Sequence, residues 1–146
     1  MQGFQGVVFN VNPKVNGVTI KNLTIKNVCH DSLSSAIYFD SDDGSVIDYT
    51  FINNSAKYAG AVLFFQSGKL INCTFTNNSA TMGHGAVQFR IGVGDVTNCT
   101  FINNRAAEDC GALYIFEGTV TNCTFTNNKA NGKGGAIHIQ SSNVIN

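Results

Sequence analysis

The sequence predicts an all-β protein that folds as a right-handed parallel β-helix solenoid, with about five to six coils of 24–26 residues each. Three observations lead to this prediction. A sequence unit recurs with a period near 24 residues. The units are rich in Val, Ile, Phe and Thr and are interrupted by Asn and Gly, which is typical of short strands and corners. The 3.6-residue apolar periodicity of helical repeats is absent. A right-handed coil is predicted because crossover connections between parallel strands are almost always right-handed.

The repeat is clearest in four segments that align with one another. They are YTFINNSAKYAGAV (49–62), CTFTNNSATMGHGAV (73–87), CTFINNRAAEDCGAL (99–113) and CTFTNNKANGKGGAI (123–137). One phenylalanine recurs in each segment, at spacings of 24, 26 and 24 residues: Phe51, Phe75, Phe101 and Phe125. A weaker copy begins at Ile20 and has Ile25 in the place of phenylalanine. Leucine-rich repeats have a similar length, but their leucine spacing is absent.

Apolar residues alternate along the strand that follows each Gly-Ala corner, which predicts two inward-facing columns. The first column contains Ile37, Val62, Val87, Leu113 and Ile137. The second contains Phe39, Phe64, Phe89, Ile115 and Ile139. The next strand of each coil begins with an inward residue, which is Ile20, Val46, Leu70, Val96 or Val120. It reaches its next inward residue at Leu23, Tyr49, Cys73, Cys99 or Cys123.

These last two inward positions are three residues apart instead of two, so the alternation breaks and a bend is predicted between them. The bend residues are Asn22, Asp48, Asn72, Asn98 and Asn122. Asn and Asp tolerate the left-handed backbone conformation that a bend needs, and stacked asparagines can bond amide to amide. Two adjacent columns predict a further corner: Asn53, Asn77, Asn103 and Asn127, followed by Asn54, Asn78, Asn104 and Asn128.

The block Phe-x-x-Asn-x-Ala, followed by Gly-Ala and an aliphatic residue, occurs four times. It resembles the FxxN and GGA(I/L/V) repeats of chlamydial polymorphic outer-membrane proteins, and the wording NCTFTNN…GGAI is similar to adhesin-like surface proteins of methanogenic archaea. The resemblance covers about residues 18–146 and implies a right-handed β-helix of the pectin-lyase-like type, on a large extracellular protein that attaches without catalysis. Only Gly134-Gly135 shows the full double glycine, and the first copy departs most, with Ser35-Ala36 and no FxxN.

We expect residues 1–146 to form a single β-helix domain that is a fragment of a longer surface protein. The final SSNVIN (141–146) begins another strand, and Gly6-Val7-Val8-Phe9 resembles the strand after a Gly-Ala corner. A solenoid cut within a coil has unpaired strand edges, so end-to-end self-association through uncapped coils is the alternative to a longer parent chain. An extracellular or cell-surface location is expected, with the signal and anchor outside this sequence.

The composition argues against two classes of partner. The net charge is zero and only 12% of residues are charged, so we expect no nucleic-acid binding. No apolar run approaches the roughly 18–20 residues of a membrane-spanning helix, so no direct membrane span is predicted.

The tripeptide Gly83-His84-Gly85, with Asp42-Asp43 upstream and Arg90-Ile91 downstream, resembles a motif of pectin-cleaving hydrolases. The repeat favours another interpretation, because Gly85 aligns with corner glycines and His84 with variable positions. The aligned residues are Gly60, Gly111 and Gly135 for Gly85, and Ala59, Cys110 and Gly134 for His84. Paired carboxylates for glycoside cleavage are not in register. We therefore predict no catalytic residue and keep a polysaccharide hydrolase or lyase of the pectin-lyase-like fold as the alternative.

An acidic turn contains Asp40, Asp42 and Asp43, and alternating carboxylates with a glycine are one way to bind Ca²⁺. Phe51 stands where an EF-hand needs glutamate, so an exposed polar turn is favoured, with weak Ca²⁺ binding as the alternative, and no cofactor is predicted. The five cysteines lack zinc-type spacing and three share an inward column, so free buried thiols are expected. Six Asn-x-Ser/Thr sequons coincide with predicted corners and are interpreted as ladder residues: Asn22, Asn53, Asn72, Asn77, Asn98 and Asn122.

The outward positions of the strand after the Gly-Ala corner are the candidate binding face. One row contains Tyr38, Leu63, Gln88, Tyr114 and His138, and the row beside it contains Asp40, Phe65, Arg90, Phe116 and Gln140. Aromatic rings mixed with polar groups suit a glycan or a protein partner. The alternative is a sheet face that is partly covered or packed by an adjoining domain. The sequence thus predicts a non-catalytic adhesin-like stalk with a binding face, against either an enzyme or a plain spacer.

Overall fold

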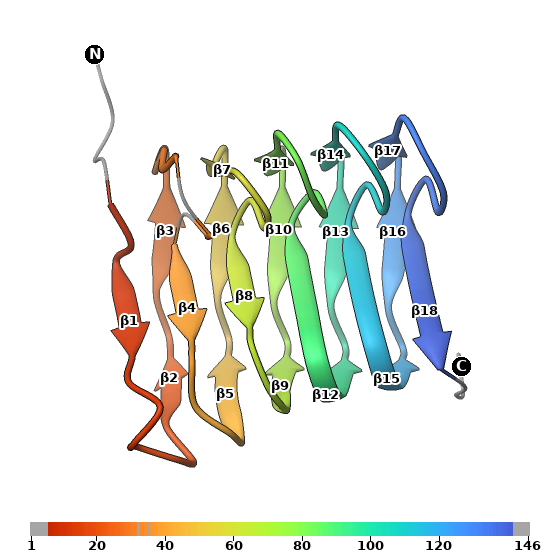
Figure 1. Ribbon diagram of the computed structural model, residues 1–146. Coiled ribbons are helices and arrows are strands. Elements are labelled where there is room, and N and C mark those ends of the chain that lie inside the picture. The colour runs from red at the N-terminus through yellow and green to blue at the C-terminus, as the bar shows by residue number, and fades with distance from the viewer. Residues whose placement is uncertain (1–5, 32, 35, 142–146) are drawn as a thin grey trace.

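The computed structural model describes residues 6–31, 33–34 and 36–141, which form a stack of coils containing 18 strands (Figure 1). Each full coil contributes strands to three sheets, and every strand pairing between coils is parallel. The described part of the chain contains no helix that is long and apolar enough to cross a membrane. The predicted all-β parallel solenoid is confirmed.

The largest sheet has nine strands and forms the long side of each coil. Its first half is made of β1 (Phe9–Val11), β4 (Ile37–Phe39) and β8 (Val62–Phe64), and its second half of β2 (Thr19–Lys21), β5 (Gly44–Ile47) and β9 (Gly68–Ile71). In the later coils both halves join into one strand in β12 (Val87–Thr97) and β15 (Leu113–Thr121), and the sheet ends with β18 (Ile137–Ser141). The predicted strand near residue 9 is confirmed, because Phe9 pairs with Ile37.

Two smaller sheets close the coil. The five-stranded sheet contains β3 (Thr24–Lys26), β6 (Thr50–Ile52), β10 (Thr74–Thr76), β13 (Thr100–Ile102) and β16 (Thr124–Thr126). The four-stranded sheet contains β7 (Ser55–Ala56), β11 (Ser79–Ala80), β14 (Arg105–Ala106) and β17 (Lys129–Ala130). The register matches the repeat predicted from the sequence, since Phe75 pairs with Phe51 and with Phe101.

The spacing of 26 residues has a local cause. Phe89 pairs with Ile115, but the next pair is Val93 with Glu117, so β12 carries two residues more than β15 at this point. Gly92 lies in this bulge with φ 140°, a conformation that favours glycine. The coil therefore absorbs the extra residues at its outer edge without disturbing the inward columns.

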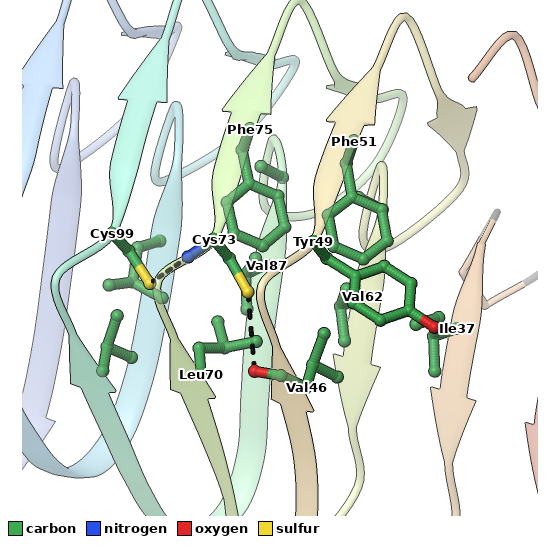
Figure 2. Close-up of a cluster of buried hydrophobic side chains, with 14 of the residues drawn as sticks. Ile37, Val46, Tyr49, Phe51, Val62, Leu70, Cys73, Phe75, Val87 and Cys99 are labelled. Carbon is green, nitrogen blue, oxygen red and sulfur yellow. Dashed lines mark hydrogen bonds between the residues drawn. The ribbon is translucent and has the colours of Figure 1, made fainter. Parts of the chain in front are cut away.

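Aromatic side chains stack along the inside of the solenoid (Figure 2). The rings of Phe51, Phe75 and Phe101 lie nearly parallel, with centroids 4.8 Å apart at each step. This distance is the spacing of neighbouring strands, so in-register pairing places identical rings on top of one another. Each fully buried phenylalanine stabilises the fold by roughly 1.5–3 kcal/mol through burial.

The predicted corners are confirmed by the backbone. The bend residues Asn22, Asp48, Asn72, Asn98 and Asn122 have φ values of 63°, 58°, 55°, 55° and 50°. The second corner has the same conformation at Asn27, Asn53, Asn77, Asn103 and Asn127, with φ between 53° and 58°. Asparagine is among the few residues that adopt this conformation at low cost, which explains its recurrence.

The asparagines that follow the second corner point into the protein and form a buried ladder. Asn54, Asn78 and Asn104 are completely buried. The Asn78 Oδ1 accepts bonds from the backbone N–H and the side-chain amide of Asn54, at 3.1 and 3.0 Å. Its own amide donates to the Phe51 carbonyl and to Asn104 Oδ1, both at 3.1 Å. Every bonding position of this side chain is therefore used.

Two predictions of burial are wrong. Leu23 occupies the position of Tyr49 and Cys73 but is 47% exposed, because β3 pairs with β6 on one side and no strand of the five-stranded sheet, in the described part of the chain, lies on its other side. Cys29 is exposed instead of buried. The predicted strand at SSNVIN falls almost entirely outside the described residues.

Candidate functional site

The first predicted outward row is assembled by the strand register. Tyr38 pairs with Leu63, Leu63 with Gln88, and Gln88 with Tyr114. His138 completes the row beside Tyr114. We call the side chains of Tyr38, Leu63, Gln88, Tyr114 and His138, together with those of Asp40, Phe65, Arg90, Phe116 and Gln140, the outer face.

Leu63 differs from the other members of its row. Its side chain is only 1% exposed, although it points away from the core, whereas the other four are half-buried. The pocket above it is lined by Leu33 and Tyr58, which lie in the loops before β4 and β8, and by Gln88 and Arg90. At Leu63 the sheet face is covered, as in the alternative of a partly covered face, because side chains from the corner loops lie over the strand.

Polar and aromatic groups alternate in the second row. The Arg90 guanidinium lies over the Phe65 ring, 5.1 Å from its centroid, and the Tyr114 hydroxyl donates a hydrogen bond to Gln140 Oε1. Partial burial raises the pKa of Tyr38, and the charge of Asp40 and a hydrogen bond to it act in the same direction. Phe116 and Phe65 are half-buried and Arg90 is exposed. The face therefore presents rings, a guanidinium and amides together.

His84 lies on this face, which the sequence did not predict. Its ring stacks on Tyr114 with centroids 4.3 Å apart and planes 9° apart, and His138 meets the other side of Tyr114 edge-on at 5.6 Å. The His84 Nδ1 lies 3.0 Å from the Asp109 carbonyl, and because a carbonyl only accepts, this nitrogen carries the proton. Burial lowers the pKa of His84, partly offset by this bond. The sequence signal that could have revealed this stack is an aromatic ring in a loop, here His84, that lies one coil before an outward-facing aromatic residue, here Tyr114.

The corner beside His84 has the geometry that the repeat predicts. A Cβ on Gly85 would lie 1.8 Å from the Gly111 carbonyl oxygen, and one on Gly60 would lie 2.2 Å from that of Gly85. Only glycine fits where consecutive coils approach this closely. The bridge between Ala59 and His84 confirms their alignment.

The acidic turn that contains Asp42 and Asp43 makes no hydrogen bond to His84, among the bonds formed by described residues. Asp42 Oδ1 accepts bonds from the backbone N–H groups of Ser67 and Asp43, both at 3.2 Å. The charged groups that act on His84 are Asp109, His138 and Glu108. In the described part of the chain, no three His, Cys, Asp or Glu side chains are placed to hold a metal ion together.

Three of the five cysteines form the predicted inward column and are free thiols. The Cys73 backbone N–H donates to Cys99 Sγ, and that of Cys99 donates to Cys123 Sγ, both at 3.4 Å (Figure 2 shows the first). Their thiols donate back to the strand carbonyls of Ile71, Thr97 and Thr121. Burial raises the pKa of Cys110 to about 12, so this thiol stays protonated.

Two of the surface pockets formed by described residues bear on the site. The first, of about 410 Å³, is the one above Leu63 on the outer face. The second, of about 340 Å³, lies beside the four-stranded sheet and is lined by Cys29, His30, Asp31, Ser55, Ala56, Lys57, Thr81 and Met82. Only the first lies among residues predicted from the sequence to bind a ligand.

The comparisons with known proteins agree with this architecture. The family described as "Right handed beta helix region" matches residues 6–146, which includes every described strand. No curated protein and no solved structure matches the chain. The right-handed parallel β-helix predicted from the sequence is confirmed.

Proposed function

The chain belongs to the right-handed β-helix family, and from this premise we propose that it is a non-enzymatic, adhesin-like module of the cell surface. In this proposal the solenoid is a rigid stalk and the outer face holds the ligand. Enzymes and non-enzymes share such scaffolds, so the proposal depends on the face itself.

The observation that carries the proposal is the aromatic cluster of His84, Tyr114 and His138. Tyr114 is flanked on both sides by rings and its hydroxyl is held by Gln140. Rings fixed in this way lose little conformational entropy on binding and offer both an apolar surface and hydrogen-bonding edges. They project from β15, from β18 and from the corner that precedes β12, and parallel pairing holds these strands on the stack. Such a surface suits attachment.

The double variant Tyr114→Ala, Phe116→Ala tests the proposal. Binding of the intact protein to a glycan array and to a peptide array is compared with that of the variant, and circular dichroism checks that both remain folded. We expect the variant to lose at least about tenfold in affinity, as for removal of buried aromatic anchors. The matched control is Ile52→Ala, Ile102→Ala, which truncates two half-buried outward residues of the five-stranded sheet.

Equal binding by the wild type and the Tyr114→Ala, Phe116→Ala variant would contradict the role of the outer face. Release of reducing ends or unsaturated products from a polysaccharide would instead identify an enzyme. A chain that retains no glycan or peptide on either array would be a spacer.

A further inference from the structure

The pocket above Leu63 has an apolar floor and a polar rim. Leu63 of β8 forms the floor, and Leu33 and Tyr58 contribute apolar walls from the corner loops. Gln88 and Arg90 of β12 supply the amide and the guanidinium. The volume of about 410 Å³ is within the range of small ligand sites.

The guanidinium of Arg90 is available to a ligand. Among the described residues it makes neither an ion pair nor a hydrogen bond, and its protein contact is the face of the Phe65 ring. Burial and the charge of Asp40 raise the pKa of Tyr38, whereas the charge of Arg90 lowers it. A guanidinium held over a ring keeps its N–H edge open for a carboxylate.

The balance of the lining favours one class of ligand. A sugar ring carries hydroxyl groups around most of its edge and needs a polar partner for many of them, because buried polar groups without partners are costly. Here the floor and two walls are apolar, and charge is present at one side. This arrangement complements an apolar side chain that has a carboxylate beside it.

We propose that this pocket binds a peptide segment in which an aliphatic side chain neighbours a carboxylate, as at a protein C-terminus that ends in leucine. The aliphatic group packs on Leu63, Leu33 and Tyr58, and the carboxylate pairs with Arg90. Gln88 bonds to the adjoining peptide group. The inference rests on the proposed function, since it names the ligand class of the same outer face.

Fluorescence anisotropy with labelled hexapeptides tests the inference on the whole protein. The first peptide ends in leucine with a free carboxylate, the second is its C-terminal amide, and the third ends in glycine with a free carboxylate. We expect the first to bind and the other two to bind about tenfold more weakly, because each loses a charge-assisted hydrogen bond or the apolar contact. Affinity for the first should fall as salt is added.

Three variants identify the residue responsible. Arg90→Gln, which keeps a polar side chain but removes the charge, should remove the difference between the acid and the amide. Asp40→Asn should strengthen binding of the acid about twofold or more, because it removes a competing negative charge. Arg105→Gln is the matched control, an exposed arginine on β14 of the four-stranded sheet, and should change nothing.

The outcomes separate this inference from the proposed function. Equal binding of acid and amide overturns the inference, and so does Arg90-dependent binding of a carboxylated oligosaccharide in place of the peptide. If the peptides fail while Tyr114→Ala, Phe116→Ala still abolishes array binding, only the inference fails. If the leucine acid binds through Arg90 and Tyr114→Ala, Phe116→Ala has no effect on the arrays, the inference stands and the role proposed for the aromatic cluster fails.

Discussion

Two columns of asparagine residues run along the solenoid with the same period, and they stabilise the fold in different ways. In the buried column, Asn78 makes four side-chain hydrogen bonds and is fully enclosed. In the exposed bend column, Asn98 donates one bond, to Asn72 Oδ1 at 3.2 Å, and has φ 55°. The buried asparagine is required for its side chain, whereas the exposed one is required for its backbone conformation.

The difference shows that recurrence of a residue does not by itself reveal why it recurs. The cost of removing a polar group depends on whether water can replace its partners. Asn78 holds a backbone N–H of Asn54 and the Phe51 carbonyl, neither of which water can reach. Substitutions in the two columns should therefore have effects of different size and different cause.

The largest effect is expected for Asn78→Ala. The change leaves the Asn54 backbone N–H and one N–H of the Asn54 side-chain amide without an acceptor, at about 1–3 kcal/mol each, so unfolding free energy should fall by about 2–6 kcal/mol. Urea denaturation followed by circular dichroism measures it. A loss below that of the exposed variant Asn98→Ala would contradict the distinction between the columns.

A smaller effect is expected for Asn98→Ala, about 1–2 kcal/mol. Alanine must adopt the left-handed conformation, which costs roughly 1–2 kcal/mol, and the exposed hydrogen bond adds little. The same denaturation experiment applies. Stability equal to that of the wild type would show that the backbone conformation at this bend is not restrictive.

The half-buried His84 side chain should make the stability of the protein depend on pH in the acid range. Burial lowers the folded pKa of His84 below its unfolded value, so the stability it contributes is present above the unfolded pKa and is lost as pH falls through the folded pKa. Thermal unfolding of wild type and His84→Gln between pH 7 and pH 4 should show a steeper acid loss for the wild type. Parallel curves would argue against this assignment.

The smallest effect is expected for Asn98→Gly, within about 0.5 kcal/mol of the wild type, because glycine adopts the left-handed conformation without strain. This variant is the control for Asn98→Ala, since both remove the same amide. If glycine costs as much as alanine, the exposed ladder bond and not the backbone carries the stability of the bend.

The inside of the coil was more predictable than the outside. Inward columns repeat in every coil, so the sequence reveals them four or five times, and Phe75 and Val87 lie where the repeat predicts. Leu23 was misplaced because the position in a column does not tell which coil is the last to be covered. Errors in the inward columns occur at the end of the stack for this reason.

The outer face was predictable only as a set of positions. The register of Gln88 and Tyr114 followed from the period, but the cover over Leu63 and the stacking of His84 on Tyr114 depend on how corner loops fold back. Loop residues do not recur at a fixed position in each coil, so aligning the repeats does not predict where their side chains lie. For this reason the sequence indicated only that His84 occupies a variable position before a corner, whereas in the structure it belongs to the aromatic cluster.

The sequence by itself determined the coil length, the inward columns and the left-handed corners, because each is a local requirement repeated at a fixed period. Only the tertiary structure decided which outward side chains meet, since residues such as Tyr58 and Arg90 come together across different coils. The pocket of about 410 Å³ arises in this way. Periodic contacts are encoded many times over, whereas a site between neighbouring coils is formed once, through contacts that no repeat specifies.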